Sequence, residues 1–206
     1  MNTKKALIFF LLGLVMLSPV LGLAEVKKEY YPNGKLRAEI NYKNGKRNGI
    51  NKLYYESGKL REERNYKNDK LEGMSKEYYE SGKLMEKSNY KNDKPEGIRK
   101  KYYESGKLLG EGNYKDGELE GIVKNYYPSG KLWMEWNYKN GKREGISKLY
   151  YEGGMLEAER RYGNDKLEGI TKVYYKDGTI KYIENYKDGQ MINRKKYDEQ
   201  GNLVKE

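Results

Sequence analysis

The chain has 206 residues, with 42 Lys+Arg and 31 Asp+Glu, and it contains no His and no Cys. Without Cys there is no disulfide framework, no thiolate nucleophile and no Cys-ligated zinc site. Without His the chain lacks the usual general base near neutral pH and the commonest transition-metal ligand. These absences narrow the chemistry open to the chain, and we expect a protein that is not an enzyme and that uses no metal and no cofactor.

The first 24 residues differ in composition from the rest of the chain. Two lysines precede an uncharged apolar run over residues 6–22, and Gly22 and Ala24 place small residues at positions −3 and −1 of a cut after Ala24. This pattern is typical of a cleaved secretory signal peptide. The alternative is an uncleaved transmembrane anchor, although the run is short for a span of roughly 20 residues. We predict a leader over 1–24 and an exported chain, 25–206, in the periplasm, on the cell surface or outside the cell.

A repeat with a period of 24 residues occupies the exported part. Tyr-Tyr pairs recur in seven copies, and a Gly and a lone Tyr follow each pair at constant spacing. Such a period indicates an array of supersecondary units. The repeat-defining residues, which we take to be structural, include Tyr54, Tyr55, Gly58, Leu60, Tyr66, Gly73, Tyr78, Tyr79, Gly82, Tyr102, Tyr103, Gly106, Tyr126, Tyr127 and Gly130.

Each unit divides into two similar halves of about 12 residues, which is room for one strand and one tight turn. The segments at 32–35, 56–59 and 43–46 place Gly where a type I turn followed by a left-handed residue needs it. Asp69 and Asp93 replace the Gly of the second turn in their units, and Asp tolerates the left-handed region. The pattern predicts an all-β, elongated antiparallel meander of about 14 short strands, a single twisted layer of hairpin units with a degenerate C-terminal cap.

In the first unit we expect strands over 36–42 and 49–55, joined so that the numbers of paired residues sum to 91. The predicted pairs are Leu36 with Tyr55, Tyr42 with Gly49, and Glu39 with Lys52. Lys recurs at the Lys52 position in all matching units and Glu recurs at most Glu39 positions, with Lys87 and Ile183 as exceptions. Opposite charges across an antiparallel pair stabilise by roughly 0.2–1 kcal/mol, so charge matching supports this register.

Alternation along these strands then divides the residues between two faces. One face carries Leu36, Ala38, Ile40, Tyr42, Leu53 and Tyr55. The other carries Arg37, Glu39, Asn41, Ile50, Lys52 and Tyr54. Neither face is rich in apolar residues, which predicts a thin sheet with many half-exposed Tyr rings.

The unit YYxxGKLxxExNYKNxKxEGIxKx resembles the MORN repeat in its bacterial variant form, from Tyr30 to about Tyr197. Chains built from this variant are identified as members of a toxin–antitoxin system antitoxin family of the YwqK type. The resemblance implies one β-hairpin per repeat, stacked edge to edge in a twisted sheet. It also implies a scaffold that makes protein contacts, and it links the repeat to phospholipid binding.

We therefore predict an exported, non-catalytic scaffold that binds a protein or a component of the envelope or membrane surface. One alternative is an antitoxin or immunity-type protein that neutralises a toxin by binding it, but an antitoxin against a cytosolic toxin should stay in the cytosol. A further alternative is a wall-glycan-binding repeat. Nucleic acid is not an expected partner, because no continuous basic stripe emerges along the units.

Trp133 and Trp136 are the only Trp residues and interrupt the repeat pattern. Trp is enriched at binding hot spots, so both are candidate ligand-binding residues. The alternative is that repeat drift has placed them in packed positions. At i and i+3 in a predicted strand, their side chains are expected to point to opposite faces.

Overall fold

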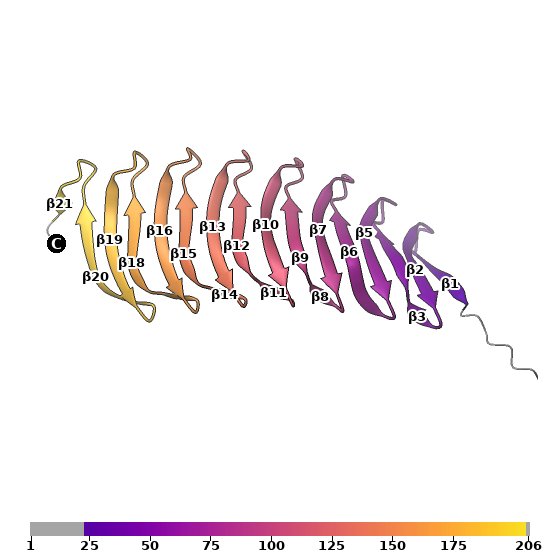
Figure 1. The fold of residues 1–206 in the computed structure, drawn as a ribbon. Helices are drawn as coiled ribbons and strands as arrows, with labels where there is room; N and C mark the ends of the chain where they lie inside the picture. The colour runs from indigo at the N-terminus through magenta and orange to yellow at the C-terminus, as the bar shows by residue number, and fades with distance from the viewer. Residues whose placement is uncertain (1–22, 205–206) are drawn as a thin grey trace, which may run out of the picture.

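The computed structural model describes residues 23–204. These residues form one antiparallel sheet of 21 strands and contain no helix. The strands follow one another across the sheet in chain order, so the described ends lie at opposite ends of an elongated, curved layer (Figure 1). This confirms the predicted all-β hairpin meander. The predicted leader lies almost entirely outside the described residues.

The strand bounds explain why the sheet has more strands than the expected 14. In most hairpins two extra residues interrupt the returning strand and separate a two-residue piece from it. The longer strands are β1 (Ala24–Tyr30), β2 (Leu36–Lys43), β4 (Gly49–Tyr54), β5 (Leu60–Lys67), β6 (Lys70–Tyr78), β7 (Leu84–Lys91), β9 (Gly97–Tyr102), β10 (Leu108–Lys115), β12 (Gly121–Tyr126), β13 (Leu132–Lys139), β15 (Gly145–Tyr150), β16 (Leu156–Gly163), β18 (Gly169–Tyr174), β19 (Ile180–Lys187) and β20 (Gln190–Tyr197). The two-residue strands are β3 (Lys46–Arg47), β8 (Lys94–Pro95), β11 (Glu118–Leu119), β14 (Lys142–Arg143), β17 (Lys166–Leu167) and β21 (Leu203–Val204).

The two turns of each unit differ in type. At the first, the Gly34 amide donates to the Tyr31 carbonyl at 2.9 Å and Gly34 has φ +81°, as expected for a type I turn followed by a left-handed residue. At the second, Asn44 and Gly45 both have positive φ, 53° and 73°. At residues 43–46 we had also predicted a type I turn followed by a left-handed residue. That prediction was wrong, because two consecutive left-handed residues make a two-residue type I′ turn. Asp69 adopts the left-handed region, as predicted, with φ 68°.

The predicted register is confirmed in the middle of each hairpin. Glu39 lies opposite Lys52, and the equivalent pairs recur in the other units. Leu36 and Tyr55, which we expected to face each other, are not paired, because β4 ends at Tyr54 and Tyr55 begins the next turn.

The predicted register was wrong near the hairpin tip. Tyr42 pairs with Arg47 and not with Gly49. The two-residue turn closes the hairpin early, and the two extra residues then form a bulge in which the Asn48 amide donates to the Asn41 carbonyl at 2.8 Å. Gly49 completes the bulge with φ +97°, a conformation that residues with a Cβ rarely adopt.

The two faces of the sheet differ in burial. One, here called the packed face, carries Ala38, Leu53 and the residues equivalent to them; the other, here called the ladder face, carries Glu39, Lys52 and their equivalents. All of the buried side chains lie on the packed face, and most are polar because a single layer has little apolar material with which to cover itself. They are Ala38, Asn51, Glu62, Tyr66, Ser75, Glu86, Ser88, Ser147, Ala158, Tyr162, Thr171 and Glu184.

The Tyr-Tyr pairs connect successive units. The hydroxyl of Tyr31 donates to the Tyr54 carbonyl, and that of Tyr55 donates to the Tyr78 carbonyl, each at 2.6 Å. The same bond recurs from Tyr79, Tyr103, Tyr127, Tyr151 and Tyr175. The second Tyr of each pair therefore holds its unit to the next, which explains why the pair repeats without loss.

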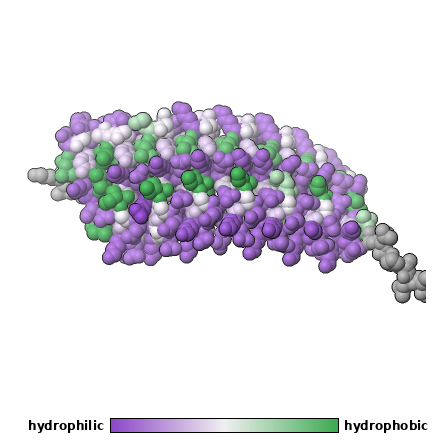
Figure 2. Space-filling model, in the orientation of Figure 1, coloured by the Kyte–Doolittle hydropathy of each residue, from purple (hydrophilic) through white to green (hydrophobic). Residues whose placement is uncertain are grey.

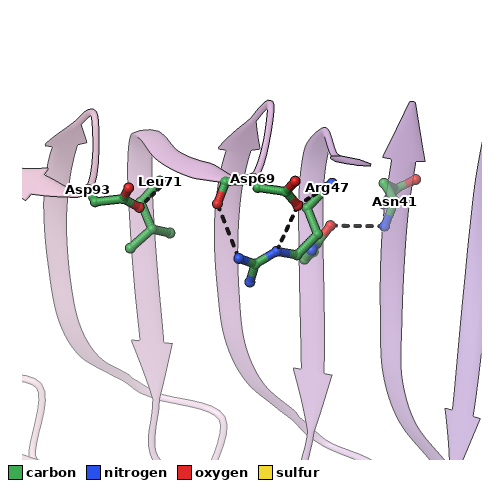
Figure 3. A network of polar contacts seen from close by, with 6 residues as sticks. Asn41, Arg47, Asp69, Leu71 and Asp93 are labelled. Carbon is green, nitrogen blue, oxygen red and sulfur yellow. Dashed lines mark hydrogen bonds and ion pairs between the residues drawn. The ribbon is translucent and has the colours of Figure 1, made fainter. Parts of the chain in front are cut away.

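At the opposite ends of the strands, the second turns of successive units hold one another (Figure 3). Arg47 donates its amide to the Asp69 carboxylate at 2.8 Å, and the Asp69 amide donates back to the Arg47 carbonyl at 3.0 Å. One unit further on, the Leu71 amide donates to Asp93 at 2.7 Å. Each Asp turn thus docks on the preceding unit. Successive units are therefore joined by local contacts at both ends of their strands.

Candidate binding surface

A row of half-exposed apolar side chains runs along the ladder face. Its members recur every 24 residues and are 49% to 60% exposed: Val26, Ile50, Met74, Ile98, Ile122, Ile146 and Ile170. Neighbouring strands lie about 4.8 Å apart, so successive members are about 10 Å apart. Figure 2 shows apolar positions recurring at regular intervals between hydrophilic rows.

The strands between these members place polar residues in the same row. Asn65 lies opposite Ile50, Asn89 opposite Met74, and similar pairs continue across the sheet, with Arg161 opposite Ile146 as the exception. The side-chain amide of Asn41 donates a hydrogen bond to the Ile50 carbonyl. The row therefore alternates between an apolar contact and a hydrogen-bonding group.

A second row, here called the charge ladder, lies two residues further along the strands. Pairing across the sheet gives the order Lys28, Glu39, Lys52, Glu63, Lys76, Lys87, Lys100, Glu111, Lys124, Glu135, Lys148, Glu159, Lys172 and Ile183. Signs alternate along this order except around Lys87 and at the final Ile183.

Register alone does not say which Lys each Glu contacts. Glu111 lies opposite Lys124, as predicted, but its short ion pair is with Lys100 on its other side, at 2.8 Å. That contact lowers the pKa of Glu111. Most of the other close pairs of the ladder also join neighbouring units and not the two strands of one hairpin, as in Lys28–Glu39 at 3.4 Å.

Tyr hydroxyls complete the ladder. The Tyr54 hydroxyl donates to Glu39 at 2.9 Å, and this bond lowers the pKa of Glu39. Burial, reinforced by the same bond, raises the pKa of Tyr54 to about 12. The bond recurs between Tyr78 and Glu63, Tyr126 and Glu111, and Tyr150 and Glu135, at 3.2 to 3.4 Å. The first Tyr of the pair thus belongs to the exposed surface and the second to the junction between units.

Shallow depressions lie on the ladder face between the apolar side chains. One is lined by Ile122, Ile146, Glu135 and Lys148, and another by Val26, Ile50, Glu39 and Lys52. Each combines two members of the apolar row with a charged pair. Such hollows suit side chains of a partner and do not enclose a small molecule.

Trp133 and Trp136 do not form a shared site. The Trp133 ring lies 5.9 Å from that of Tyr127, whereas Trp136 stacks on Tyr162 at 5.8 Å and the Arg143 guanidinium lies 4.8 Å from its centroid. Trp133 is also the extra residue of a bulge, between paired Leu132 and Met134. Simple alternation, on which we based the expectation of opposite faces, does not apply at such a position.

The packed face carries buried ion pairs in its middle strands. Glu86 is 7% exposed and contacts Arg99 at 2.6 Å and Lys101 at 3.4 Å. Glu62 contacts Arg64 at 2.6 Å, yet burial still raises the pKa of Glu62. These pairs neutralise charge inside the face, so they do not present an acid–base pair to solvent.

The sequence contained signals for two features that we did not interpret. The Ile at every 24th position indicates the apolar row, because it falls on the charged face where burial cannot explain it. The two Tyr of each pair lie on adjacent positions and so must serve different surroundings. The ion-pair partners inside the packed face had no comparable periodic signal.

A family model described as MORN repeat variant matches seven stretches, 26–44, 47–68, 71–92, 95–116, 119–140, 143–164 and 167–188, which together cover well over half of the chain. The chain belongs to the MORN repeat variant family. MORN repeats are generally binding or scaffold repeats, and proteins built from them are typically non-catalytic. The last matched stretch ends at residue 188, before β20. No curated protein matched the chain.

Residues 23–204 of this MORN repeat chain include no helix long and apolar enough to cross a membrane.

Proposed function

We propose that this MORN repeat chain is a non-catalytic scaffold that binds a protein partner on its ladder face. The observation that carries the proposal is the row of half-exposed Val, Ile and Met side chains at every second strand. Regular apolar exposure on one face is a mark of an interaction surface, because water contact with these groups is unfavourable. The packed face offers no such row in the described residues.

The neighbouring rows support the same proposal. Protein interfaces combine apolar contacts with a polar, solvent-accessible rim. Here the Asn side chains between the apolar residues offer hydrogen bonds, and the charge ladder runs alongside them. The surface is repeated and elongated, which suits a partner that lies along several units.

A photo-crosslinking experiment in the native cell tests the proposal. A crosslinking amino acid at Ile122, on the ladder face, should give a discrete adduct with a partner protein. The matched control is the same amino acid at Lys59, an exposed turn residue away from the row. Equal capture from both positions, or no adduct at Ile122, contradicts binding through this face.

Export is a separate part of the proposal and rests on the sequence of residues 1–24. Ala24 is the first residue of β1 and pairs with Lys43 at the edge of the sheet. Cleavage after Ala24 leaves the pairs from Glu25 onward in place. Sequencing of the protein from its native host should therefore begin at Glu25, whereas Met1 on soluble cytosolic protein would contradict export.

An antitoxin of the YwqK type is the alternative form of the binding proposal. It would use the same face against a toxin, but the proposed leader removes the chain from a cytosolic target. Co-expression of the chain, with and without residues 1–24, beside a candidate toxin separates the two. Rescue of growth only without the leader would favour the antitoxin.

A further inference from the structure

The charge ladder changes sign order at one place. Lys87 occupies a position where most units carry Glu, so Lys76, Lys87 and Lys100 lie directly opposite one another on β6, β7 and β9. Like charges directly across an antiparallel pair are destabilising. We call these three residues the basic step.

The lysines of the basic step differ in their partners. Lys76 lies 4.0 Å from Glu63 and Lys100 lies 2.8 Å from Glu111, each on the outer side of the step. Lys87 makes no ion pair among residues 23–204. The glutamates behind it, Glu77 and Glu86, lie on the packed face and contact arginines there.

Tyr102 provides a second observation at the same place. In four other units the equivalent Tyr hydroxyl donates to the Glu of the ladder, as Tyr54 does to Glu39. For Tyr102 the residue in the matching position is Lys87, which accepts no hydrogen bond. The step therefore collects three ammonium groups and a hydroxyl, all of them donors, with one carboxylate on each side.

We propose that the basic step is the site at which the ladder face recognises an acidic, partly apolar peptide segment of its partner. The inference rests on the proposed function of that face and names the chemistry of the partner. A carboxylate on the partner would supply the acceptor that Lys87 and Tyr102 lack. It would also relieve the repulsion among the three lysines.

The spacing of the two rows fits a helix laid across the strands. Adjacent lysines of the step are about 4.8 Å apart, close to the 5–6 Å between side chains at i and i+4 of a helix. Met74 and Ile98, two residues before Lys76 and Lys100, are about 10 Å apart, close to the rise of one heptad. Glutamates at i and i+4 would meet the lysines while apolar residues seven apart meet Met74 and Ile98.

The extent of the step favours a peptide over a membrane surface. Glu63 and Glu111 bound it on both sides, about 19 Å apart across four strand spacings. A flat anionic bilayer would meet these carboxylates and those of the rest of the ladder. A helix of about two heptads is about 21 Å long and also crosses Glu63 and Glu111, but it can place its own glutamates over the three lysines alone and uncharged residues over those two carboxylates.

Fluorescence anisotropy with a labelled helical peptide of about two heptads tests the proposal. The peptide has one Glu pair, at i and i+4, and Leu at i+1 and i+8, and the control peptide has Gln in place of both Glu. The purified full chain should bind the Glu peptide and lose affinity about tenfold in Lys87→Glu. The Lys87→Glu variant should also melt at a higher temperature, because it restores alternating charge, so lost binding cannot be ascribed to unfolding.

A gain-of-function variant is the matched control. Glu159→Lys creates a second triplet of lysines between Lys148 and Lys172, beside Ile146 and Ile170. It should strengthen binding of the Glu peptide, and binding should weaken as salt rises. Unchanged affinity in Lys87→Glu, or equal binding of the Gln peptide, overturns the proposal. Binding to phosphatidylglycerol vesicles that depends on Lys87, without peptide binding, overturns it in favour of a membrane. In either case a crosslinked adduct at Ile122 would still support the proposed function of the ladder face.

Discussion

Strands β5–β9 and strands β13–β16 share one backbone design and differ on both faces. On the packed face, the middle strands place Glu62, Glu77 and Glu86 opposite one another, whereas the later strands place Met134, Leu149 and Ala158 in the same row. On the ladder face, Lys87 reverses the charge in the first region only. The bonds between units are the same in both regions.

This difference shows how the array separates folding from recognition. The Tyr hydroxyl bonds and the docked turns lie at the two ends of the strands. They therefore hold successive units together independently of the side chains on the two faces. The faces can then diverge from unit to unit. Charge has accumulated in one region and aromatic packing in the other, and four changes test how much each contributes.

The largest effect is expected at the buried ion pair of β7 and β9. Arg99→Met leaves the Glu86 carboxylate with Lys101 alone in a buried position and should lower the free energy of unfolding by about 2 kcal/mol. Urea unfolding measures it. The control is Arg160→Met in the later region, where the arginine makes no ion pair among the described residues. Equal losses of stability in Arg99→Met and Arg160→Met contradict a special role for the Glu86–Arg99 pair. Adding Glu86→Met to Arg99→Met should recover most of the stability lost in the single variant.

A smaller effect is expected in the aromatic region. Trp136→Leu removes the stack on Tyr162 and the contact with Arg143, and should cost about 1.5 kcal/mol in urea unfolding. Trp133→Leu is the matched control, because Trp133 is 39% exposed and contacts one ring. A larger loss from Trp133 than from Trp136 would mean that packing is concentrated at the turn and not within the face.

Glu111, at the boundary of the basic step, should interact more strongly with Lys100 than with Lys124. A double-mutant cycle between Glu111→Gln and Lys100→Gln should give a favourable coupling energy at low salt, and the cycle with Lys124→Gln should give a smaller one. Both couplings should fall in high salt, since exposed charges are screened over about 8–10 Å. If the Lys124 cycle gives the larger value, Glu111 contacts its hairpin partner in solution.

The smallest effect is expected at alkaline pH, where the bond between Tyr54 and Glu39 of the charge ladder should weaken. Folding raises the pKa of Tyr54 from 10 to about 12. The protonated hydroxyl therefore contributes stability that is fully present below pH 10 and is lost as the pH rises towards 12. Urea midpoints of the parent chain and of Tyr54→Phe should converge over this interval, and parallel curves would mean that the bond to Glu39 does not contribute. Because Tyr54 is partly exposed, the expected change is under about 1 kcal/mol.

Much of the fold followed from residue spacing. The recurrence of Tyr, Gly, Glu and Lys predicted the hairpin units, the single layer and the Glu39–Lys52 pairing. The tip was mispredicted because the register was extended past Gly49, where a bulge adds two residues. The binding surface was only partly anticipated: we expected Ile50 on the charged face but did not interpret its repetition. Trp133 and Trp136, chosen for residue type, lie in separate contacts, and a ligand role for either stays a prediction.

The period, the all-β class and the opposition of Glu and Lys can be predicted from the amino-acid order, because each depends on spacing along one chain. Which Lys each Glu contacts, where each Tyr hydroxyl donates and how Arg99 neutralises Glu86 become visible only in the folded sheet. Those contacts depend on the bulges and on the distance between side chains of neighbouring strands. The sequence contains Lys87 as one exception in a column, and three-dimensional pairing places it between Lys76 and Lys100. Strands that pair across the sheet bring each of these residues to about 4.8 Å from the next, although they lie at least 11 residues apart in the chain.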